Sequence, residues 1–333
     1  MLPQILLCGD IVWMSLEKVE AMFEGLADIV QMNSSNRADF LASFQSGGKH
    51  ERVVGIYRRN MSAYSIGTFD KNLIEGLPSI VKWVAHNGAG YDQVDVHACK
   101  NKGIFVSNVP NAVDDATATT ALYLVISCLR HFSYAERSLR AGQWKTSISA
   151  RNTYDLTSRT LGILGLGGIG LRLAHLAHAF PMRIVYHSRR RNPKAPEWCE
   201  YVDNIDTLCQ QADVLSLHVP LNQATEKIIG EREIRLLKRG SVIVNTARGM
   251  VVDQEAMIKA LEDGHLSSVG LDVFPNEPEV DPRLMKFRQN VLLPHMGTET
   301  SDTEAAMELQ ALTNLRDFLK TGQGKDIVPE MRA

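Results

Sequence analysis

Short apolar runs alternate with stretches of helical spacing along most of this chain. In the first third, the apolar runs predict strands at residues 5–8, 53–57, 80–85 and 104–107. Helical spacing between them predicts helices at 16–23, 38–44, 71–77 and 94–101. Strands that alternate with helices form βαβ units around a parallel sheet, so this part predicts a doubly wound α/β domain.

The second half repeats the alternation. Apolar runs predict strands at 161–164, 183–187, 212–218, 241–245, 268–273 and 290–293, with helices at 171–177, 231–237 and 253–261. A weakly polar stretch at 116–139 predicts one long helix buried on several sides, followed by an extended polar arm at 140–160. A last amphipathic helix at 304–319 is expected to return to the first domain, which lacks a closing element.

The length of 333 residues exceeds what one hydrophobic core usually supports. A turn at 108–111 marks a boundary. We therefore expect two doubly wound parallel-sheet domains. The first covers 1–111 plus 300–333, and the second covers 112–299.

Composition excludes several classes of function. The formal net charge of −2 gives no reason to expect a nucleic acid or an anionic membrane as a partner. The five cysteines are scattered without a CxxC pair, which favours reduced thiols in a cytoplasmic protein and no metal site. No secretory signal is evident, and no apolar segment approaches the roughly 20 residues that span a bilayer.

The apolar run at 161–164 leads directly into a glycine-rich turn and a helix. The turn reads Gly165-Leu166-Gly167-Gly168-Ile169-Gly170, a GxGxxG pattern. The first glycine allows the turn, the second lets a diphosphate approach the backbone, and the third lets helix and strand pack closely. An ordinary structural turn is the alternative, but the flanking strand and helix favour a dinucleotide site.

The residues after the second nucleotide strand usually select the cofactor. An acid there binds the ribose hydroxyls of NAD, whereas arginine accommodates the 2′-phosphate of NADP. Here the sequence is Ser188-Arg189-Arg190, with no acid. A basic solvated loop is the alternative, but this position favours NADP.

Three residues of complementary chemistry follow later strands. Arg248 follows the strand at 241–245, Glu277 follows that at 268–273, and His295 follows that at 290–293. Arginine can hold a carboxylate, histidine can transfer a proton, and a carboxylate beside it stabilises the imidazolium. Each alone has a plain structural explanation, but together at strand ends they form the set that reduces a 2-oxo acid.

The strand at 80–85 ends in Gly88-Ala89-Gly90-Tyr91. Its glycines expose backbone N–H groups that suit a carboxylate. A plain strand-to-helix turn explains them equally well.

These motifs together resemble the D-isomer-specific 2-hydroxyacid dehydrogenase family over nearly the whole chain. The resemblance rests on the glycine turn, Asn245-Thr246-Ala247-Arg248-Gly249, the run from Gly270 to Pro278, Leu293-Pro294-His295-Met296-Gly297, and Gly88-Ala89-Gly90-Tyr91-Asp92. Within the family, the chain looks most like fungal-type NADPH-dependent glyoxylate/hydroxypyruvate reductases, which are similar to D-mandelate dehydrogenase. This closer likeness rests on residues 108–110 and 116–118, on the Ser188-Arg189 pair in place of an acid, and on residues 327–330 near the end of the chain.

The resemblance implies a flavodoxin-like substrate domain at 1–111 plus 300–333 and a Rossmann dinucleotide-binding domain at 112–299. It also implies roles for individual residues. Arg248, Glu277 and His295 are expected to be catalytic, and the Ala89 and Gly90 N–H groups to bind the substrate carboxylate with Arg248 and His295. The expected cofactor-binding residues are Gly165, Leu166, Gly167, Gly168, Ile169, Gly170, Ser188, Arg189, Arg190, Val219, Pro220, Thr246, Ala247, Arg248, Asp272, His295 and Gly297. Asp272 is expected to hydrogen-bond the nicotinamide carboxamide.

The implied reaction is the NADPH-dependent reduction of glyoxylate, hydroxypyruvate or larger 2-oxo acids, including phenyl-substituted ones. The resemblance also implies a homodimer built on the long helix and the polar arm. A non-catalytic, nucleotide-sensing regulator on the same scaffold is the alternative, although the chain lacks long disordered flanks and basic tracts.

Overall fold

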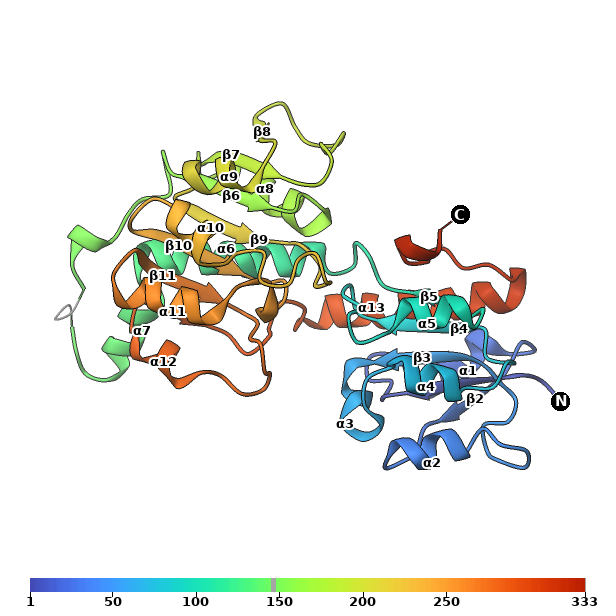
Figure 1. Ribbon diagram of the computed structural model, residues 1–333. Coiled ribbons are helices and arrows are strands. Elements are labelled where there is room, and N and C mark those ends of the chain that lie inside the picture. Colours follow the sequence, from blue (N-terminus) through green and yellow to red (C-terminus); the bar gives the residue numbers. More distant parts are fainter. Residues whose placement is uncertain (145–147, 333) are drawn as a thin grey trace. The chain divides into compact units, whose positions relative to one another are not determined.

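The computed structural model describes residues 1–144 and 148–332 (Figure 1). Two compact units divide the chain. The first consists of Met1–Val113 together with Thr300–Ala333, and the second of Asp114–Glu299.

The first unit contains a five-stranded sheet in the order β2-β1-β3-β4-β5, and all its strand pairs are parallel. Its strands are β1 (Gln4–Cys8), β2 (Asp28–Gln31), β3 (Val53–Arg59), β4 (Trp83–Asn87) and β5 (Phe105–Ser107). Its helices are α1 (Leu16–Phe23), α2 (Arg37–Ala42), α3 (Ala63–Ile66), α4 (Lys71–Gly76), α5 (Val96–Asn101) and α13 (Ser301–Thr321). Helix α13 packs against β3 and β4 (Figure 1).

The second unit contains a seven-stranded parallel sheet in the order β12-β11-β10-β9-β6-β7-β8. Its strands are β6 (Thr160–Leu164), β7 (Arg183–His187), β8 (Cys199–Tyr201), β9 (Val214–Leu217), β10 (Ser241–Asn245), β11 (Leu266–Leu271) and β12 (Val291–Leu292). Its helices are α6 (Asp114–Arg130), α7 (Phe132–Arg140), α8 (Gly168–His178), α9 (Ile205–Gln211), α10 (Glu231–Leu236), α11 (Gln254–Glu262) and α12 (Pro282–Lys286). These units confirm the predicted fold class of two parallel-sheet α/β domains.

The core of the second unit follows from strand alternation, because successive side chains of a strand point to opposite faces. Ile243 on β10 packs into one buried cluster with α10 and α11. Val242 and Val244 on the same strand pack into the other cluster, with α6 and α8. Both faces of the sheet are therefore covered by helices, as a parallel sheet requires.

The prediction of one helix over 116–139 is wrong. The structure has α6 and α7, which are separated at His131, where φ is +52°. This left-handed conformation cannot continue a right-handed helix. Strands β2 and β8 and helices α3, α9 and α12 were not predicted; each has seven residues or fewer. The predicted arm at 140–160 includes residues 145–147, which lie outside the described residues; its described part contains a 3₁₀ turn at Ala150–Asn152.

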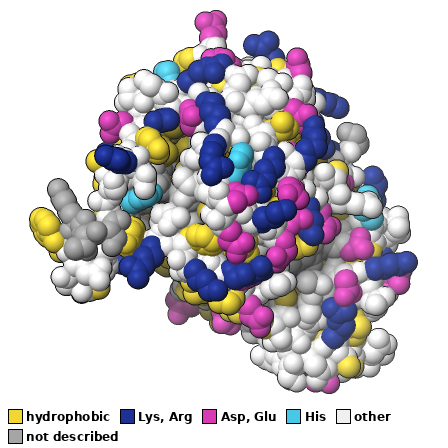
Figure 2. All heavy atoms as spheres, turned by 60° about the vertical axis from the view of Figure 1, so that its left-hand side comes forward, with side chains coloured by type: hydrophobic (Ala, Val, Ile, Leu, Met, Phe, Trp, Pro, Cys, Tyr) yellow, Lys and Arg dark blue, Asp and Glu magenta, His cyan; other side chains and the backbone are white. Residues whose placement is uncertain are grey.

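On the face drawn in Figure 2, basic and acidic side chains are interspersed. Within residues 1–144 and 148–332, no helix combines the length and apolarity needed to cross a membrane. The same residues contain no group of three or more His, Cys, Asp or Glu that could hold a metal ion. All five cysteines are buried and unpaired.

Candidate active site

The carboxyl ends of five neighbouring strands form one edge of the second sheet. Across that edge Leu164 of β6 pairs with Leu217 of β9, Leu217 with Asn245 of β10, Asn245 with Leu271 of β11, and Leu271 with Leu292 of β12. The segments that follow these strands carry Gly165, Val219, Thr246, Asp272 and His295. Ligands of open parallel sheets bind at such an edge.

The glycine turn leaves room for a ligand at one position and none at the others. A Cβ on Gly167 would meet open space, whereas one on Gly165 would lie 2.8 Å from the His218 carbonyl oxygen, and one on Gly170 2.3 Å from the Gly165 carbonyl oxygen. Gly165 also has φ of +96°, which favours glycine. Helix α8 begins directly after Gly167, so its free N–H groups lie beside this open position.

Ser188 and Asn192 hold the same turn from the β7 side. The Leu166 N–H donates to Ser188 Oγ at 2.8 Å, and the Asn192 amide donates to the Leu166 carbonyl at 2.7 Å. Arg189 and Arg190 are exposed beyond Ser188. Two exposed cations therefore follow β7 where the adenosine ribose of a dinucleotide lies.

Thr246 and the segment after β9 complete the edge. The Thr246 hydroxyl is buried and has no hydrogen-bond partner among the described residues, which suits a site that a polar ligand completes. Val219 and Pro220 follow β9, and the Pro220 carbonyl accepts from the Thr225 hydroxyl at 2.5 Å. The residues present therefore fit a dinucleotide.

Arg248 is held by its own turn. The Asn245 amide donates to the Arg248 carbonyl at 2.8 Å and accepts from the Ala247 N–H at 2.9 Å. A Cβ on Gly249 would lie 2.0 Å from the Phe274 carbonyl carbon, so only glycine permits this turn to pack against the segment that leads to Glu277.

The Glu277 carboxylate holds the His295 imidazole. Its Oε2 lies 2.7 Å from His295 Nδ1, and its Oε1 accepts from the Phe274 N–H at 2.8 Å. The hydrogen bond that His295 donates to Glu277 raises the pKa of His295 above its usual value, against the opposing effect of burial. Burial alone would raise the pKa of Glu277, but the hydrogen bonds from His295 and the Phe274 N–H hold that pKa below its usual range. The geometry therefore favours an imidazolium–carboxylate pair.

Asp272 shapes the turn that carries His295. Its buried carboxylate accepts from the Met296 N–H at 2.6 Å and the Gly297 N–H at 2.8 Å, and its carbonyl accepts from the His295 N–H at 2.8 Å. Burial raises the pKa of Asp272. His295 adopts φ of +57°, a left-handed conformation that these three hydrogen bonds hold in place.

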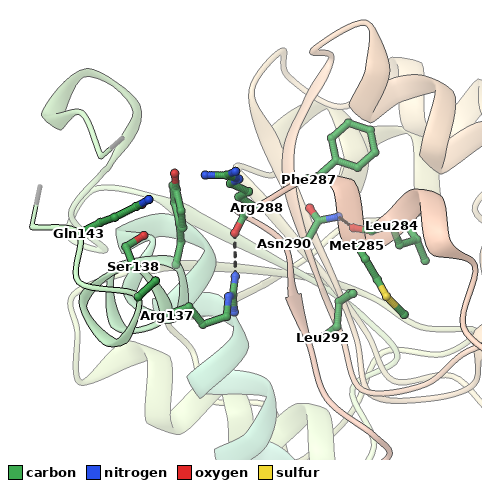
Figure 3. Close-up of a pocket in the computed structure, with 11 residues that line it drawn as sticks. Arg137, Ser138, Gln143, Leu284, Met285, Phe287, Arg288, Asn290 and Leu292 are labelled. Carbon is green, nitrogen blue, oxygen red and sulfur yellow. Dashed lines mark hydrogen bonds between the residues drawn. The ribbon is translucent and has the colours of Figure 1, made fainter. Parts of the chain in front are cut away.

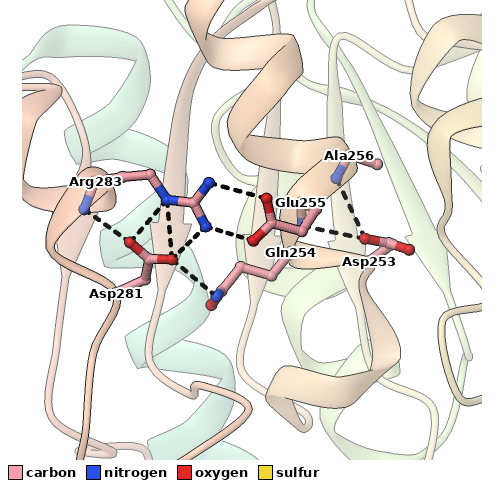
Figure 4. A network of polar contacts seen from close by, with 6 residues as sticks. All are labelled: Asp253, Gln254, Glu255, Ala256, Asp281 and Arg283. Carbon is pink, nitrogen blue, oxygen red and sulfur yellow. Dashed lines mark hydrogen bonds and ion pairs between the residues drawn. The ribbon is translucent and has the colours of Figure 1, made fainter.

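A polar network fixes the segment that follows Glu277 (Figure 4). The Arg283 guanidinium donates to Asp281 and to Glu255, so it joins α12 to the first turn of α11. Asp281 and Asp253 cap α12 and α11 respectively. These caps anchor the loop from which Glu277 projects.

In the first unit, the Gly88–Tyr91 loop follows β4 with its carbonyls fixed in place. The Gly88 carbonyl accepts from the Val109 N–H at 3.1 Å, and the Ala89 carbonyl accepts from the Asn108 amide at 2.7 Å. Because N–H and C=O point to opposite sides of a trans peptide, these contacts turn the Ala89 and Gly90 N–H groups away from Asn108 and Val109. Among the described residues, neither N–H donates to a protein acceptor. Two N–H groups left open in this way favour an anion-binding loop over a plain turn.

Sequence reasoning missed Asn108 as a support of this loop, and it missed the buried His86 beneath it. Asn108 could be found only as a polar residue at a predicted boundary, and His86 only as a polar residue directly after an apolar run. Neither pattern distinguishes a supporting side chain from an ordinary turn or core residue.

A cavity of about 430 Å³ lies beside α7. Figure 3 shows it between α7 and the segment from α12 to β12, where the Arg137 side chain donates to the Arg288 carbonyl at 2.8 Å. None of the predicted site residues lines it.

Comparison with known proteins identifies the family. A sequence profile described as "D-isomer specific 2-hydroxyacid dehydrogenase, NAD binding domain" matches residues 122–297. The chain is 42% identical to 4-methyl-2-oxopentanoate reductase A of Aspergillus oryzae over 332 residues, which cover 99% of both chains. The chain belongs to the D-isomer-specific 2-hydroxyacid dehydrogenase family, as its motifs predicted.

Solved structures agree with this assignment. A glyoxylate reductase from Paecilomyes thermophila is 42% identical with a TM-score of 0.94 and 99% coverage of both chains. An NADPH-dependent glyoxylate/hydroxypyruvate reductase from Sinorhizobium meliloti, solved with NADP and malonate, is 30% identical with a TM-score of 0.82 and the same coverage. The protein is therefore an oxidoreductase with 2-hydroxyacid dehydrogenase or glyoxylate reductase activity and a domain that binds NAD(P).

Proposed function

We propose that this protein is an NADPH-dependent reductase that converts 2-oxo acids to D-2-hydroxy acids, with Arg248, Glu277 and His295 as its catalytic residues. The observation that carries the proposal is the 2.7 Å contact between His295 Nδ1 and Glu277 Oε2. A histidine held in this way by a carboxylate can act as a general acid near neutral pH.

Glu277 binds Nδ1 of His295, so the proton that His295 transfers sits on Nε2. The nicotinamide, when bound, supplies the hydride that reduces the 2-oxo carbon. His295 Nε2 protonates the carbonyl oxygen, and Glu277 stabilises the imidazolium before the transfer. Arg248 binds the substrate carboxylate and stabilises the negative charge that develops on the oxygen. The Ala89 and Gly90 N–H groups are proposed to bind the same carboxylate.

The proposed cofactor is NADP. Support comes from Ser188-Arg189-Arg190 after β7, where no carboxylate is present to repel a 2′-phosphate. The structural relative from Sinorhizobium meliloti, which was solved with NADP, is consistent with this choice. The glycine turn, Ser188, Thr246, Ala247, Asp272 and Gly297 are proposed to bind the rest of the dinucleotide.

The proposed substrates include 2-oxo acids with bulky apolar side chains as well as glyoxylate and hydroxypyruvate. Parallel pairing places the loops after β1, β3 and β4 at one edge of the first sheet, since Cys8 pairs with Arg58 and Arg58 with His86. Neighbouring strands lie about 4.8 Å apart, so the loop after β1 lies about 10 Å along the edge from the Gly88–Tyr91 loop. The loop after β1 presents Val12 and Trp13, which are 59% and 43% exposed.

Glu308 on α13 holds this apolar loop in place. Its buried carboxylate accepts from the backbone N–H groups of Val12 at 2.9 Å, Trp13 at 3.1 Å and Met14 at 2.6 Å. Three hydrogen bonds to a carboxylate fix a loop firmly. A rigid apolar wall near the carboxylate loop suits a branched or aromatic side chain, in keeping with the relative named for 4-methyl-2-oxopentanoate.

We also propose a cytoplasmic homodimer that forms through α7. All five thiols are unpaired, which fits a reducing compartment. On α7, the apolar side chains of Phe132 and Leu139 are 48% and 58% exposed. Sedimentation of the wild type and of Leu139→Asp tests the dimer: the wild type should sediment as a dimer and the variant as a monomer, whereas a monomeric wild type at all concentrations would contradict it.

Loss of NADPH absorbance tests the function. The panel contains glyoxylate, hydroxypyruvate, 4-methyl-2-oxopentanoate and a phenyl-substituted 2-oxo acid. Turnover of at least one of them supports the enzyme. NADPH binding without turnover across the panel favours the nucleotide-sensing regulator instead.

A further inference from the structure

Arg58, at the carboxyl end of β3, is a fully buried cation with an unusual set of partners. Its guanidinium donates to the Asn60 side chain at 3.0 Å, to His86 Nδ1 at 3.0 Å and to the Gln93 side chain, and it lies over the Phe69 ring at 5.3 Å. Burial lowers the pKa of Arg58 to about 10, so it stays charged at neutral pH. Burying a cation costs free energy. The hydrogen bonds above go to neutral side chains, and the Asp92 carboxylate offsets part of the effect of burial through its negative charge.

The contact with Arg58 fixes the protonation of His86. A guanidinium can only donate, so His86 Nδ1 must accept and carry no proton. Its Nε2 lies 2.9 Å from the Gly90 carbonyl oxygen, which can only accept. His86 is therefore neutral with its proton on Nε2. Its imidazole links Arg58 to the loop, because it accepts from the guanidinium and donates to the Gly90 carbonyl.

This relay completes the set of contacts that orient the Gly88–Tyr91 loop. The Gly88 and Ala89 carbonyls are held by Val109 and Asn108, and the Gly90 carbonyl is held by His86. With the peptide planes on both sides of Gly90 fixed, a residue that would otherwise be the freest in the loop has one conformation. The imidazole also fills the space beside Gly88, where a Cβ would lie 2.5 Å from Nε2.

We propose that Arg58 and His86 are positioning residues for the substrate carboxylate. His86 holds the loop so that its N–H groups face the anion, and the buried charge of Arg58 attracts the anion from beneath the loop. The inference rests on the proposed function, since it assigns the carboxylate to the Ala89 and Gly90 N–H groups. A buried cation behind preoriented N–H groups selects substrates that carry a carboxylate.

The test compares a 2-oxo acid with its uncharged methyl ester as substrates of Arg58→Gln. We expect kcat/KM for the acid to fall at least about tenfold, mostly through KM, while kcat/KM for the ester stays within about threefold. Arg52→Gln is the matched control, because Arg52 lies beyond the opposite end of β3 and pairs with Asp28; it should change neither value. Equal losses for acid and ester, or no change for the acid, would overturn the inference.

His86 variants decide the case if Arg58→Gln fails to fold. His86→Ala removes the donor to the Gly90 carbonyl, and His86→Gln supplies an amide donor in its place. A selective loss on the acid for His86→Ala that His86→Gln partly restores supports the inference, and the same effect in both variants contradicts it. A wild type that reduces no 2-oxo acid would instead refute the proposed function.

Discussion

His295 Nδ1 lies 2.7 Å from Glu277 Oε2, although helix α12 and strand β12 separate the two residues along the chain. The contact exists because three backbone hydrogen bonds to Asp272 hold His295 in a left-handed turn, while the Phe274 N–H holds the other Glu277 oxygen. The site is thus fixed by backbone contacts as much as by its side chains.

Replacing Glu277 with Gln should change the pH dependence of reduction. Glu277 raises the pKa of His295, and reduction needs protonated His295, so the wild-type rate falls as pH rises through that raised pKa. Without the carboxylate the fall should occur at lower pH. The check is kcat for 2-oxo acid reduction between about pH 5 and pH 9. An alkaline fall at the same pH in both proteins would show that Glu277 does not set this pKa.

Replacing both Arg189 and Arg190 with Ala should reduce the preference for NADPH. Each charged hydrogen bond to a phosphate contributes about 1.5–3 kcal/mol, so the ratio of kcat/KM values for NADPH and NADH should fall at least about tenfold. Arg183→Ala is the control, since Arg183 begins β7 and binds Glu200 at 2.8 Å. An unchanged ratio in the double variant would refute the cofactor assignment.

Replacing Trp13 with Ala should weaken catalysis on large substrates selectively. Burial of an apolar side chain contributes about 1.5–3 kcal/mol, so kcat/KM for 4-methyl-2-oxopentanoate should fall about tenfold or more while that for glyoxylate changes little. Ile80→Ala is the control, because Ile80 is an exposed apolar residue that precedes β4 and so lies toward the other end of the sheet. Equal losses in kcat/KM on both substrates would argue against a role of Trp13 in binding the substrate side chain.

The sequence predicted most strands and the polar and charged residues that follow them, because the period of apolar residues and the glycine turn are local signals. The break at His131 was not predictable, since neither glycine nor proline marks it and only the left-handed backbone ends α6. The Arg58–His86–Gly90 relay was likewise hidden. It joins two strands and a loop, and an arginine at a strand end usually suggests an exposed residue rather than one with no accessible surface.

The most direct test of the central claim is the rate of 2-oxo acid reduction by His295→Ala, measured together with NADPH binding. General acid catalysis contributes about 10²–10⁴-fold, so kcat should fall at least about a hundredfold while the Kd for NADPH stays within about threefold of the wild-type value. A kcat within a few-fold of wild type would contradict the assignment of His295 as the proton donor.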